Sequence, residues 1–173
     1  MNIVLFDTPY NRLALKPFSD TKPVAKIRVG ITTIEEKWQA YIPGNYSFIT
    51  ADYLTSKFPE ISEKTNLCIN GSIIPNSSLV KAINNLRPHE MLMHHDTIVA
   101  FWSEQITSFY LYPDNFLKVQ ASAIPVPFTD EVMQLKNKWD IFLYNEQAIK
   151  EDFQQFKTQR TSGSLQYAHT VLY

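Results

Sequence analysis

Ile3-Val4-Leu5-Phe6-Asp7 is the stretch of sequence that decides the fold. Its four apolar residues form an uninterrupted run, two of them are β-branched, and a polar residue ends the run. Runs of this kind are typical of strands in parallel sheets whose two faces are both covered. We therefore expect Ile3–Phe6 to lie inside a mostly parallel sheet and not at its edge.

Downstream of this run, strand-like and helix-like segments alternate as far as residue 86, which favours βαβ units. Strands are expected at 47–49 and 66–70, and helices at 34–41, at 50–58 with Thr50 as its cap, and after a cap at Asn76 or Ser77. The first helix has a candidate cap at Thr32 and another at Thr33, because an acid follows each by three residues. Pro43 and Gly44 end that helix.

The second half of the chain has a different pattern. Residues 91–93 and 97–102 predict an antiparallel hairpin, 107–112 a further strand, and Pro125 and Pro127 a stiff crossing. A helix begins at Asn145, and Ile149, Phe153 and Phe156 share the face by which we expect it to dock. The prediction is one Rossmann-like, three-layer α/β domain with a mixed sheet over residues 1–160. Residues 161–173 are expected to be a linker and tail.

Composition excludes several classes of function. The chain has 173 residues with 16 Lys and Arg against 17 Asp and Glu, so its net charge of -1 argues against nucleic acid and against a membrane surface as partners. The one cysteine, Cys68, excludes an internal disulfide and a multi-cysteine zinc site, and its apolar neighbours predict a small buried side chain. No apolar run is long enough for a membrane span and no secretory signal is visible, so a cytoplasmic location is expected.

The adjacent histidines in His94-His95-Asp96 allow two interpretations. Neighbouring residues of a strand point to opposite faces, so two such histidines seldom bind one metal ion together. A hairpin turn is the better interpretation, and a zinc site is the alternative.

The segment from Asp7 to Gly30 follows the first strand, where ligands bind in open α/β sheets. It contains Arg12, Lys22 and Arg28 and runs into the helix that begins near Thr32, whose free N–H groups favour an anion. We therefore predict that the three cations converge on a phosphate-bearing ligand. The alternatives are a solvated basic loop and, for Arg28, an ion pair with Asp7 or Asp20.

Three blocks of the sequence resemble the sugar-1-phosphate nucleotidyltransferases. Leu5-Phe6-Asp7-Thr8-Pro9-Tyr10-Asn11-Arg12 stands where that family has its L-A-A-G-x-G-T-R nucleotide loop, with Lys22-Pro23 as a displaced P-K pair. Cys68-Ile69-Asn70-Gly71-Ser72-Ile73-Ile74-Pro75 resembles the segment that contains G-D-x-P. More specifically, three stretches together resemble a divergent subfamily: K-P-V-A-K-I-R-V-G-I-T-T-I-E-E-K-W from residue 22, I-N-G-S-I-I-P from residue 69, and W-D-I-F-x-x-N from residue 139. That subfamily is related to the uridylyltransferase half of the bifunctional N-acetylglucosamine-1-phosphate enzyme.

The resemblance implies transfer of a nucleotidyl group from a nucleoside triphosphate to a hexose or hexosamine 1-phosphate, with Mg²⁺ and release of pyrophosphate. Arg12 and Lys22 would be catalytic and would contact the phosphates. Residues Asp7, Asn11 and Arg28 would bind the nucleotide, and Asn70, Gly71 and Ser72 would bind the sugar.

The sequence also departs from the family pattern. Thr8 and Tyr10 replace two loop glycines that let phosphates approach the backbone, and Ser72 replaces the metal-binding aspartate. Asp140 or Asn145 is then a candidate metal ligand, although Asn145 also fits a plain helix cap. The alternative function is a degenerate domain that binds nucleotides or supports an attached acyltransferase. In that subfamily a left-handed β-helix follows, so the resemblance implies such a C-terminal partner domain.

Overall fold

The structure is a computed structural model that describes residues 1–104 and 123–159. Its centre is a mixed six-stranded sheet with the strand order β4-β1-β5-β7-β6-β8. The strands are β1 (Asn2–Phe6), β4 (Asn45–Ile49), β5 (Asn66–Asn70), β6 (Glu90–His94), β7 (Thr97–Ser103) and β8 (Ile124–Pro127). A separate small hairpin pairs β2 (Arg28–Val29) with β3 (Thr32–Thr33).

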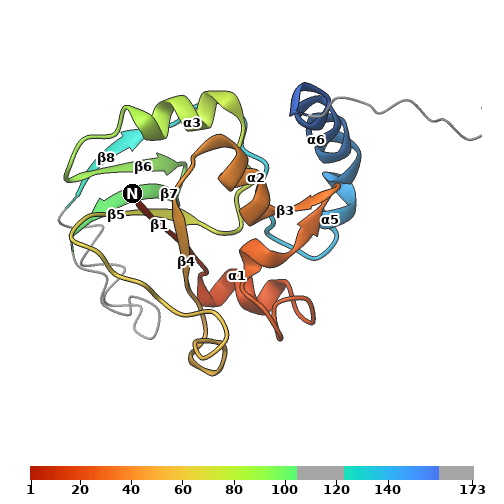
Figure 1. Cartoon of the computed structure of the whole chain (residues 1–173), viewed down its shortest axis with the longest axis horizontal. Helices are drawn as coiled ribbons and strands as arrows, with labels where there is room; N and C mark the ends of the chain where they lie inside the picture. The colour runs from red at the N-terminus through yellow and green to blue at the C-terminus, as the bar shows by residue number, and fades with distance from the viewer. Residues whose placement is uncertain (105–122, 160–173) are drawn as a thin grey trace, which may run out of the picture.

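The helices and helical turns connect these strands or follow them in the chain. They are α1 (Pro9–Ala14), η1 (Val24–Lys26), α2 (Ile34–Tyr41), η2 (Asp52–Leu54), α3 (Ser77–Asn84), α5 (Asp140–Leu143) and α6 (Asn145–Gln159). Figure 1 shows hairpin β2–β3 reaching from the sheet toward α5 and α6, which follow one another in a column.

Strand β1 lies inside the sheet, which confirms the prediction from its apolar run. It pairs in parallel with β4 on one side and with β5 on the other, and all five of its residues are buried. Ile3 and Leu5 belong to the larger apolar cluster, whereas Val4 and Phe6 belong to the smaller one. Since alternate residues of a strand point to opposite faces, the continuous run supplies apolar contacts on both faces of the sheet.

Helix α2 forms as predicted, and the structure identifies Thr33 as its cap. The Thr33 hydroxyl accepts from the Glu36 backbone N–H, while the Glu36 carboxylate accepts from the Thr33 N–H, which completes a capping box. Buried Ile34 and Trp38 attach the helix to the core, and the Trp38 indole N–H donates to the Ile73 carbonyl oxygen. Asn76 caps α3, one of the two residues that the sequence offered.

The predicted helix over 50–58 is wrong, because the chain forms only the short turn η2 there. Thr50 does not cap it: its hydroxyl donates to the Asp7 carboxylate 2.5 Å away and accepts from Arg12. The Thr50 side chain, which the local sequence pattern predicted as a helix cap, is therefore used in a tertiary contact with Asp7 and Arg12.

The predicted proline crossing is also wrong, because Ile124–Pro127 forms strand β8, which pairs in parallel with β6. Strand β8 tolerates proline because it lies at the edge of the sheet. On its outer side no strand needs the hydrogen bond that a backbone N–H would donate.

The hairpin around the histidines is confirmed, with β6 and β7 joined by His95 and Asp96 and placed in the half of the sheet that ends at β8. The strand predicted at 107–112 and the linker at 161–164 lie outside the described residues.

Helix α6 docks through a different face from the one predicted. Its buried residues are Ala148 and Asp152, whereas Ile149 and Phe153 are exposed by 42% and 60%. The cause is a polar anchor: the Asp152 carboxylate forms an ion pair with Lys37, and both side chains are buried. Gly30 lies so close to α6 that an added Cβ would be 2.9 Å from the Ala148 carbonyl carbon. The polar contact and the close approach together turn the aromatic side of α6 outward.

Candidate functional site

The carboxyl ends of five strands lie at one edge of the sheet, with β8 among them because it pairs in parallel with β6. Strands β4, β1 and β5 are parallel, and β6 runs the same way because β7 is antiparallel to both β5 and β6. Thr50, Asp7, Asn70 and His94 therefore stand at the same edge. This is the edge at which open α/β sheets bind their ligands.

Asp7 is the buried acid of this edge. Its carboxylate accepts hydrogen bonds from the Val24 N–H at 2.9 Å, the Thr50 hydroxyl at 2.5 Å and the Arg12 guanidinium at 2.8 Å. Burial raises the pKa of Asp7, and the hydrogen bonds from Thr50 and Arg12 oppose that rise. The carboxylate joins β1 to β4 and to the turn at η1.

Arg12 gives its donors to protein atoms. Beyond Asp7 and Thr50, its guanidinium donates to the Tyr53 hydroxyl at 2.8 Å, and to the backbone carbonyl oxygens of Ser19 at 2.5 Å and Lys22 at 3.4 Å. Only 11% of the side chain is exposed. The Arg12 side chain therefore ties α1 to the strand ends, and its charge already has a buried carboxylate as its partner.

The residues predicted to bind sugar form a second, neighbouring network. The Ser72 hydroxyl donates to the Asn70 side-chain oxygen at 2.7 Å and accepts from the Asn11 amide at 2.7 Å. Gly71 donates its N–H to the Phe6 carbonyl oxygen, which continues the β1–β5 ladder past the strand end. The structure thus brings Asn11, Asn70, Gly71 and Ser72 together.

Sequence reasoning missed Gln134 in this network. Its amide donates to the Ser72 hydroxyl at 3.1 Å, and the segment around it runs antiparallel to residues 72–74. Nothing local in the sequence identifies Gln134, because its contact depends on a pairing 62 residues apart along the chain.

A cleft of about 430 Å³ opens beside Arg12 at the ends of β1 and β4. Pro9, Leu13 and Tyr53 give it apolar and aromatic walls, while Lys16 brings a positive charge to it and Asp52 a negative one. The Tyr53 ring is 64% exposed, and the Arg12 guanidinium carbon lies 5.8 Å from its centroid. Tyr53 was not predicted, since an aromatic residue in a surface loop has no distinctive spacing.

Lys22 lies next to Arg12, because its own carbonyl oxygen accepts from the Arg12 guanidinium. The Lys22 side chain is half-exposed, and no hydrogen bond or ion pair of its ammonium is found within the described residues. Lys16 is exposed and contacts Asp20 at 3.4 Å. Lys16 and Lys22 therefore leave their charges more accessible than Arg12 does.

Arg28 lies elsewhere. It is exposed on β2 and donates to the Ile31 carbonyl oxygen. The hydrogen bond from the Thr33 backbone lowers the pKa of Glu36 on α2, and the charge of Arg28 adds a smaller effect in the same direction. In the described ranges no contact joins Arg28 to Arg12 or Lys22, and neither Asp7 nor Asp20 pairs with it.

The anion predicted at the start of α2 is supplied by the chain itself. The Asp152 carboxylate accepts from the backbone N–H groups of Ile31 at 2.8 Å and Thr32 at 3.3 Å, and it pairs with Lys37. The expectation that a ligand phosphate binds these groups is therefore corrected. A carboxylate 120 residues away in the sequence occupies the position.

A second cleft of about 530 Å³ lies at the same sheet edge, beyond the Ser72 network. It is lined by Asn76, His94, His95, Glu131, Tyr144 and Gln147, among others. His95 has a positive φ of 52°, and its ring lies 4.4 Å from the ring of His94. Burial and the neighbouring His95 lower the pKa of His94, which favours the neutral imidazole.

The residues considered as metal ligands have structural partners. The Asp140 carboxylate accepts from the N–H groups of Lys136 and Asn137 at 2.7 Å, and the Asn145 side-chain oxygen accepts from the Gly30 N–H at 2.9 Å. Across residues 1–104 and 123–159, no group of three or more His, Cys, Asp or Glu could hold a metal ion.

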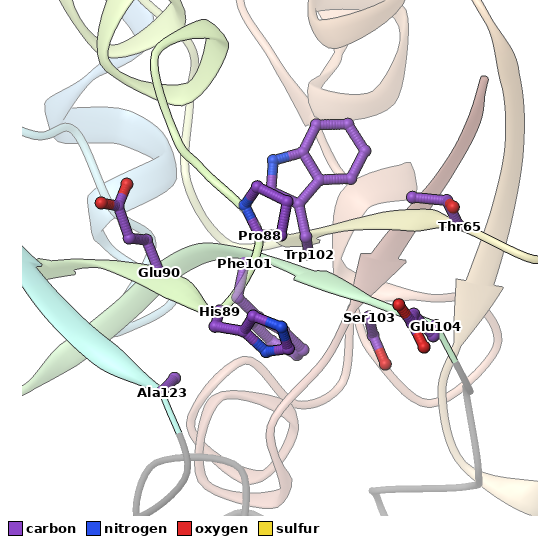
Figure 2. Close-up of a pocket in the computed structure, with 9 residues that line it drawn as sticks. All are labelled: Thr65, Pro88, His89, Glu90, Phe101, Trp102, Ser103, Glu104 and Ala123. Carbon is purple, nitrogen blue, oxygen red and sulfur yellow. The ribbon is translucent and has the colours of Figure 1, made fainter.

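A further cavity of about 340 Å³ lies at the opposite end of the sheet, at the amino ends of β5 and β6. Figure 2 shows Trp102 and His89 among its walls, and the carboxylates of Glu90 and Glu104 at opposite ends. The acids therefore do not converge there, and none of the predicted site residues lines this cavity.

Comparison with known proteins identifies the family. A family model described as "Sugar nucleotidyl transferase" matches residues 3–161, which is nearly the whole chain. The chain therefore belongs to the sugar nucleotidyl transferase family. No curated protein matches it.

The match agrees with the α/β fold and the mostly parallel six-stranded sheet. Membership implies a nucleoside triphosphate and a sugar phosphate as substrate classes, and the family typically uses Mg²⁺. In the part of the chain that the structure describes, no helix is both long and apolar enough to span a membrane.

Proposed function

We propose that this domain transfers a nucleotidyl group from a nucleoside triphosphate to a hexose or hexosamine 1-phosphate. In this reaction an oxygen of the sugar phosphate forms a bond to the α-phosphorus, and the bond from that phosphorus to the bridging oxygen breaks, which releases pyrophosphate. The observation that carries the proposal is the pair of clefts on either side of the Asp7 and Ser72 networks, at one sheet edge of a chain that belongs to this family.

The nucleoside fits the cleft beside Arg12. A base could lie against the exposed Tyr53 ring and Leu13, because an aromatic face and apolar walls suit a flat heterocycle. The phosphates would then extend toward Lys16 and Lys22, whose ammonium groups can move to meet them. Arg12 would act as a positioning residue that holds Tyr53 and the Lys22 backbone in place.

The sugar phosphate fits the cleft that contains the histidines. Asn76, Glu131 and Gln147 offer amide and carboxylate groups for sugar hydroxyls, and His95 can donate to a phosphate oxygen. Asn70 and Ser72 are buried and bonded to each other, so they would form the wall between the two substrates. Holding the reacting groups in line, together with electrostatic stabilisation of the phosphates, is most of what a protein contributes to phosphoryl chemistry of this kind.

The residues present do not form a ready-made site for Mg²⁺. Both oxygens of the Asp7 carboxylate have donors, and Ser72 offers a neutral hydroxyl that is already bonded. Mg²⁺ demands octahedral oxygen ligands, most often carboxylates, phosphates and water. We therefore assign no metal ligand to this chain and derive no step through the ion.

Release of pyrophosphate tests the proposal. The chain is incubated with uridine or another nucleoside triphosphate and with glucose 1-phosphate or N-acetylglucosamine 1-phosphate, with Mg²⁺ and with a chelator. We expect release only when both substrates and Mg²⁺ are present. His95→Ala should raise the KM for the sugar phosphate without changing the KM for the triphosphate, and Lys81→Met on α3 serves as a control.

A second function is favoured by the saturated Arg12 guanidinium and by Ser72 at the position of the family's aspartate. In this case the domain binds a nucleotide or sugar nucleotide without reaction and supports an attached acyltransferase. Tight binding of a nucleotide in the absence of any pyrophosphate release would select this function over catalysis.

A further inference from the structure

Helices α5 and α6 expose an unusual amount of apolar surface. Trp139, Phe142, Leu143, Ile149 and Phe153 have exposed fractions of 60%, 75%, 70%, 42% and 60%. They come from one short stretch of chain, and Figure 1 shows α5 and α6 as a column at the side of the molecule, with hairpin β2–β3 on its inner side. We refer to these five side chains as the α5–α6 stripe.

Four of the five residues of the stripe have the spacing of a helix–helix seam, and Leu143 lies beside them. A single residue, Tyr144, separates the two helices: its N–H donates to the Asp140 carbonyl oxygen in α5, and its own carbonyl oxygen accepts from the Ala148 N–H in α6. Positions 139, 142, 146, 149, 153 and 156 then alternate by three and four residues, which is the a and d repeat of a coiled coil. Glu146 is the one charged residue among these positions.

The area of the stripe suits a dimer. With side-chain areas of about 150–250 Å² for aromatic residues, and somewhat less for Leu and Ile, the exposed fractions amount to roughly 500–600 Å². Monomeric proteins rarely expose a larger apolar patch, and a standard interface buries about 800 Å² on each partner. Covering the stripe and its polar rim would reach that size.

We propose that the α5–α6 stripe is a dimer interface on which a second copy of this chain packs, antiparallel, about a two-fold axis. A two-fold interface must be complementary to itself, and an apolar stripe with a and d spacing meets that condition. In the antiparallel register Phe142 faces Phe153 of the second copy, and Glu146 faces its Ile149.

Charge supports this register. Lys150 already pairs with Glu146 in the same chain. The antiparallel arrangement brings Lys150 of the second copy beside the same carboxylate, because position 150 lies opposite 145. Glu146 would thus be flanked by two lysines at the centre of the seam, which offsets the cost of a charge at an a position.

Light scattering after gel filtration tests the interface, with the whole chain at about 1–500 µM. We expect a reversible dimer in the wild type, and monomers for Phe142→Glu and for Phe153→Glu with unchanged circular dichroism. Ile124→Glu on β8, an equally exposed apolar side chain at 64%, is the matched control and should remain dimeric. Glu146→Lys should weaken the dimer, and the swap Glu146→Lys with Lys150→Glu should restore it.

Cysteine cross-linking tests the orientation, since Cys68 is buried and will not interfere. A mixture of Phe142→Cys and Phe153→Cys chains should form a disulfide in the presence of oxidised glutathione, whereas each variant alone should not. Cross-linking of each variant alone would overturn the antiparallel arrangement. A wild type that stays monomeric throughout the range, or a dimer that survives both glutamate substitutions, would overturn the interface.

Discussion

Substitution of Arg12 by methionine should destabilise the fold, and not merely weaken a ligand contact. Asp7 is 1% exposed and its carboxylate receives the Arg12 guanidinium at 2.8 Å, so the substitution leaves a buried charge without its counter-charge. Loss of one partner from a buried ion pair costs about 3–5 kcal/mol. Since Thr50 and Val24 still donate to Asp7, we expect the lower end, about 3 kcal/mol.

Urea unfolding followed by circular dichroism measures this loss. With a slope of about 1–3 kcal/mol per molar urea, the midpoint should fall by roughly 1–3 M at an unchanged slope. The control is Lys22→Met, on a half-exposed side chain of the same segment, which should change the free energy of unfolding by less than about 0.5 kcal/mol. Adding Asp7→Asn to Arg12→Met should recover part of the loss, because the buried charge is then gone.

The loss should also depend on pH with a defined sign. Burial raises the pKa of Asp7, and removal of Arg12 raises it further. A carboxyl group with a raised pKa keeps its proton in the folded state, so its contribution to stability falls as the pH rises above the unfolded value of about 3.9. Arg12→Met should therefore be less destabilising at pH 4 than at pH 7. A loss below about 1 kcal/mol at pH 7 would refute the role of Arg12 as a buried partner.

Other parts of the chain give three further tests. Burial raises the pKa of Cys68 to about 12, so its thiol should react with Ellman's reagent only in urea. The free energy of unfolding should fall as the pH rises above the unfolded thiol pKa of about 8.5. Rapid reaction of the thiol in the folded protein would contradict its burial. Gly30 has a φ of 78° and lies against Ala148, so Gly30→Ala should lower the free energy of unfolding by about 1–3 kcal/mol and speed amide exchange in α6. Unchanged exchange would argue against close packing between Gly30 and α6. Thr33→Ala should cost about 1 kcal/mol in urea unfolding by removing the cap of α2, and no change would mean that the capping box contributes little.

The sequence predicts well the elements whose signals are local. The apolar run of β1, the acid three residues after Thr33 and the short turn of the β6–β7 hairpin each act within a few residues, and each element formed as expected. The position of β1 inside the sheet also follows from its sequence, because a strand that is apolar on both sides needs cover on both faces.

The failures share one physical cause, which is a contact between distant parts of the chain. Thr50 bonds to Asp7 and does not cap a helix, and Asp152 takes the anion position at Thr32 from more than 100 residues away. The same Asp152 anchor turns Phe153 outward, against the docking face that its periodicity indicated. Periodicity identifies an apolar face, but it does not say whether that face meets the same domain or another molecule.

The candidate site was predicted in part. Arg12, Asp7, Asn11 and Ser72 were selected from loops that follow β1 and β5, and these loops do meet at one edge. The hydrogen-bond partners of these side chains could not be predicted. The sequence analysis expected a ligand to bond to them, whereas in the structure other residues of the chain do so. Tyr53 entered the site only through the structure.

Isothermal titration of uridine triphosphate, with Mg²⁺ present, tests most directly the claim that the cleft beside Arg12 binds the nucleotide. The titration compares the wild type with Lys16→Met, Lys22→Met and Tyr53→Ala, and uses Lys81→Met as the control. Since one charge-assisted hydrogen bond contributes about 1.5–3 kcal/mol, each lysine variant should bind about ten- to a hundredfold more weakly. An unchanged Kd in all three site variants, with circular dichroism intact, would contradict the claim and place the nucleotide elsewhere.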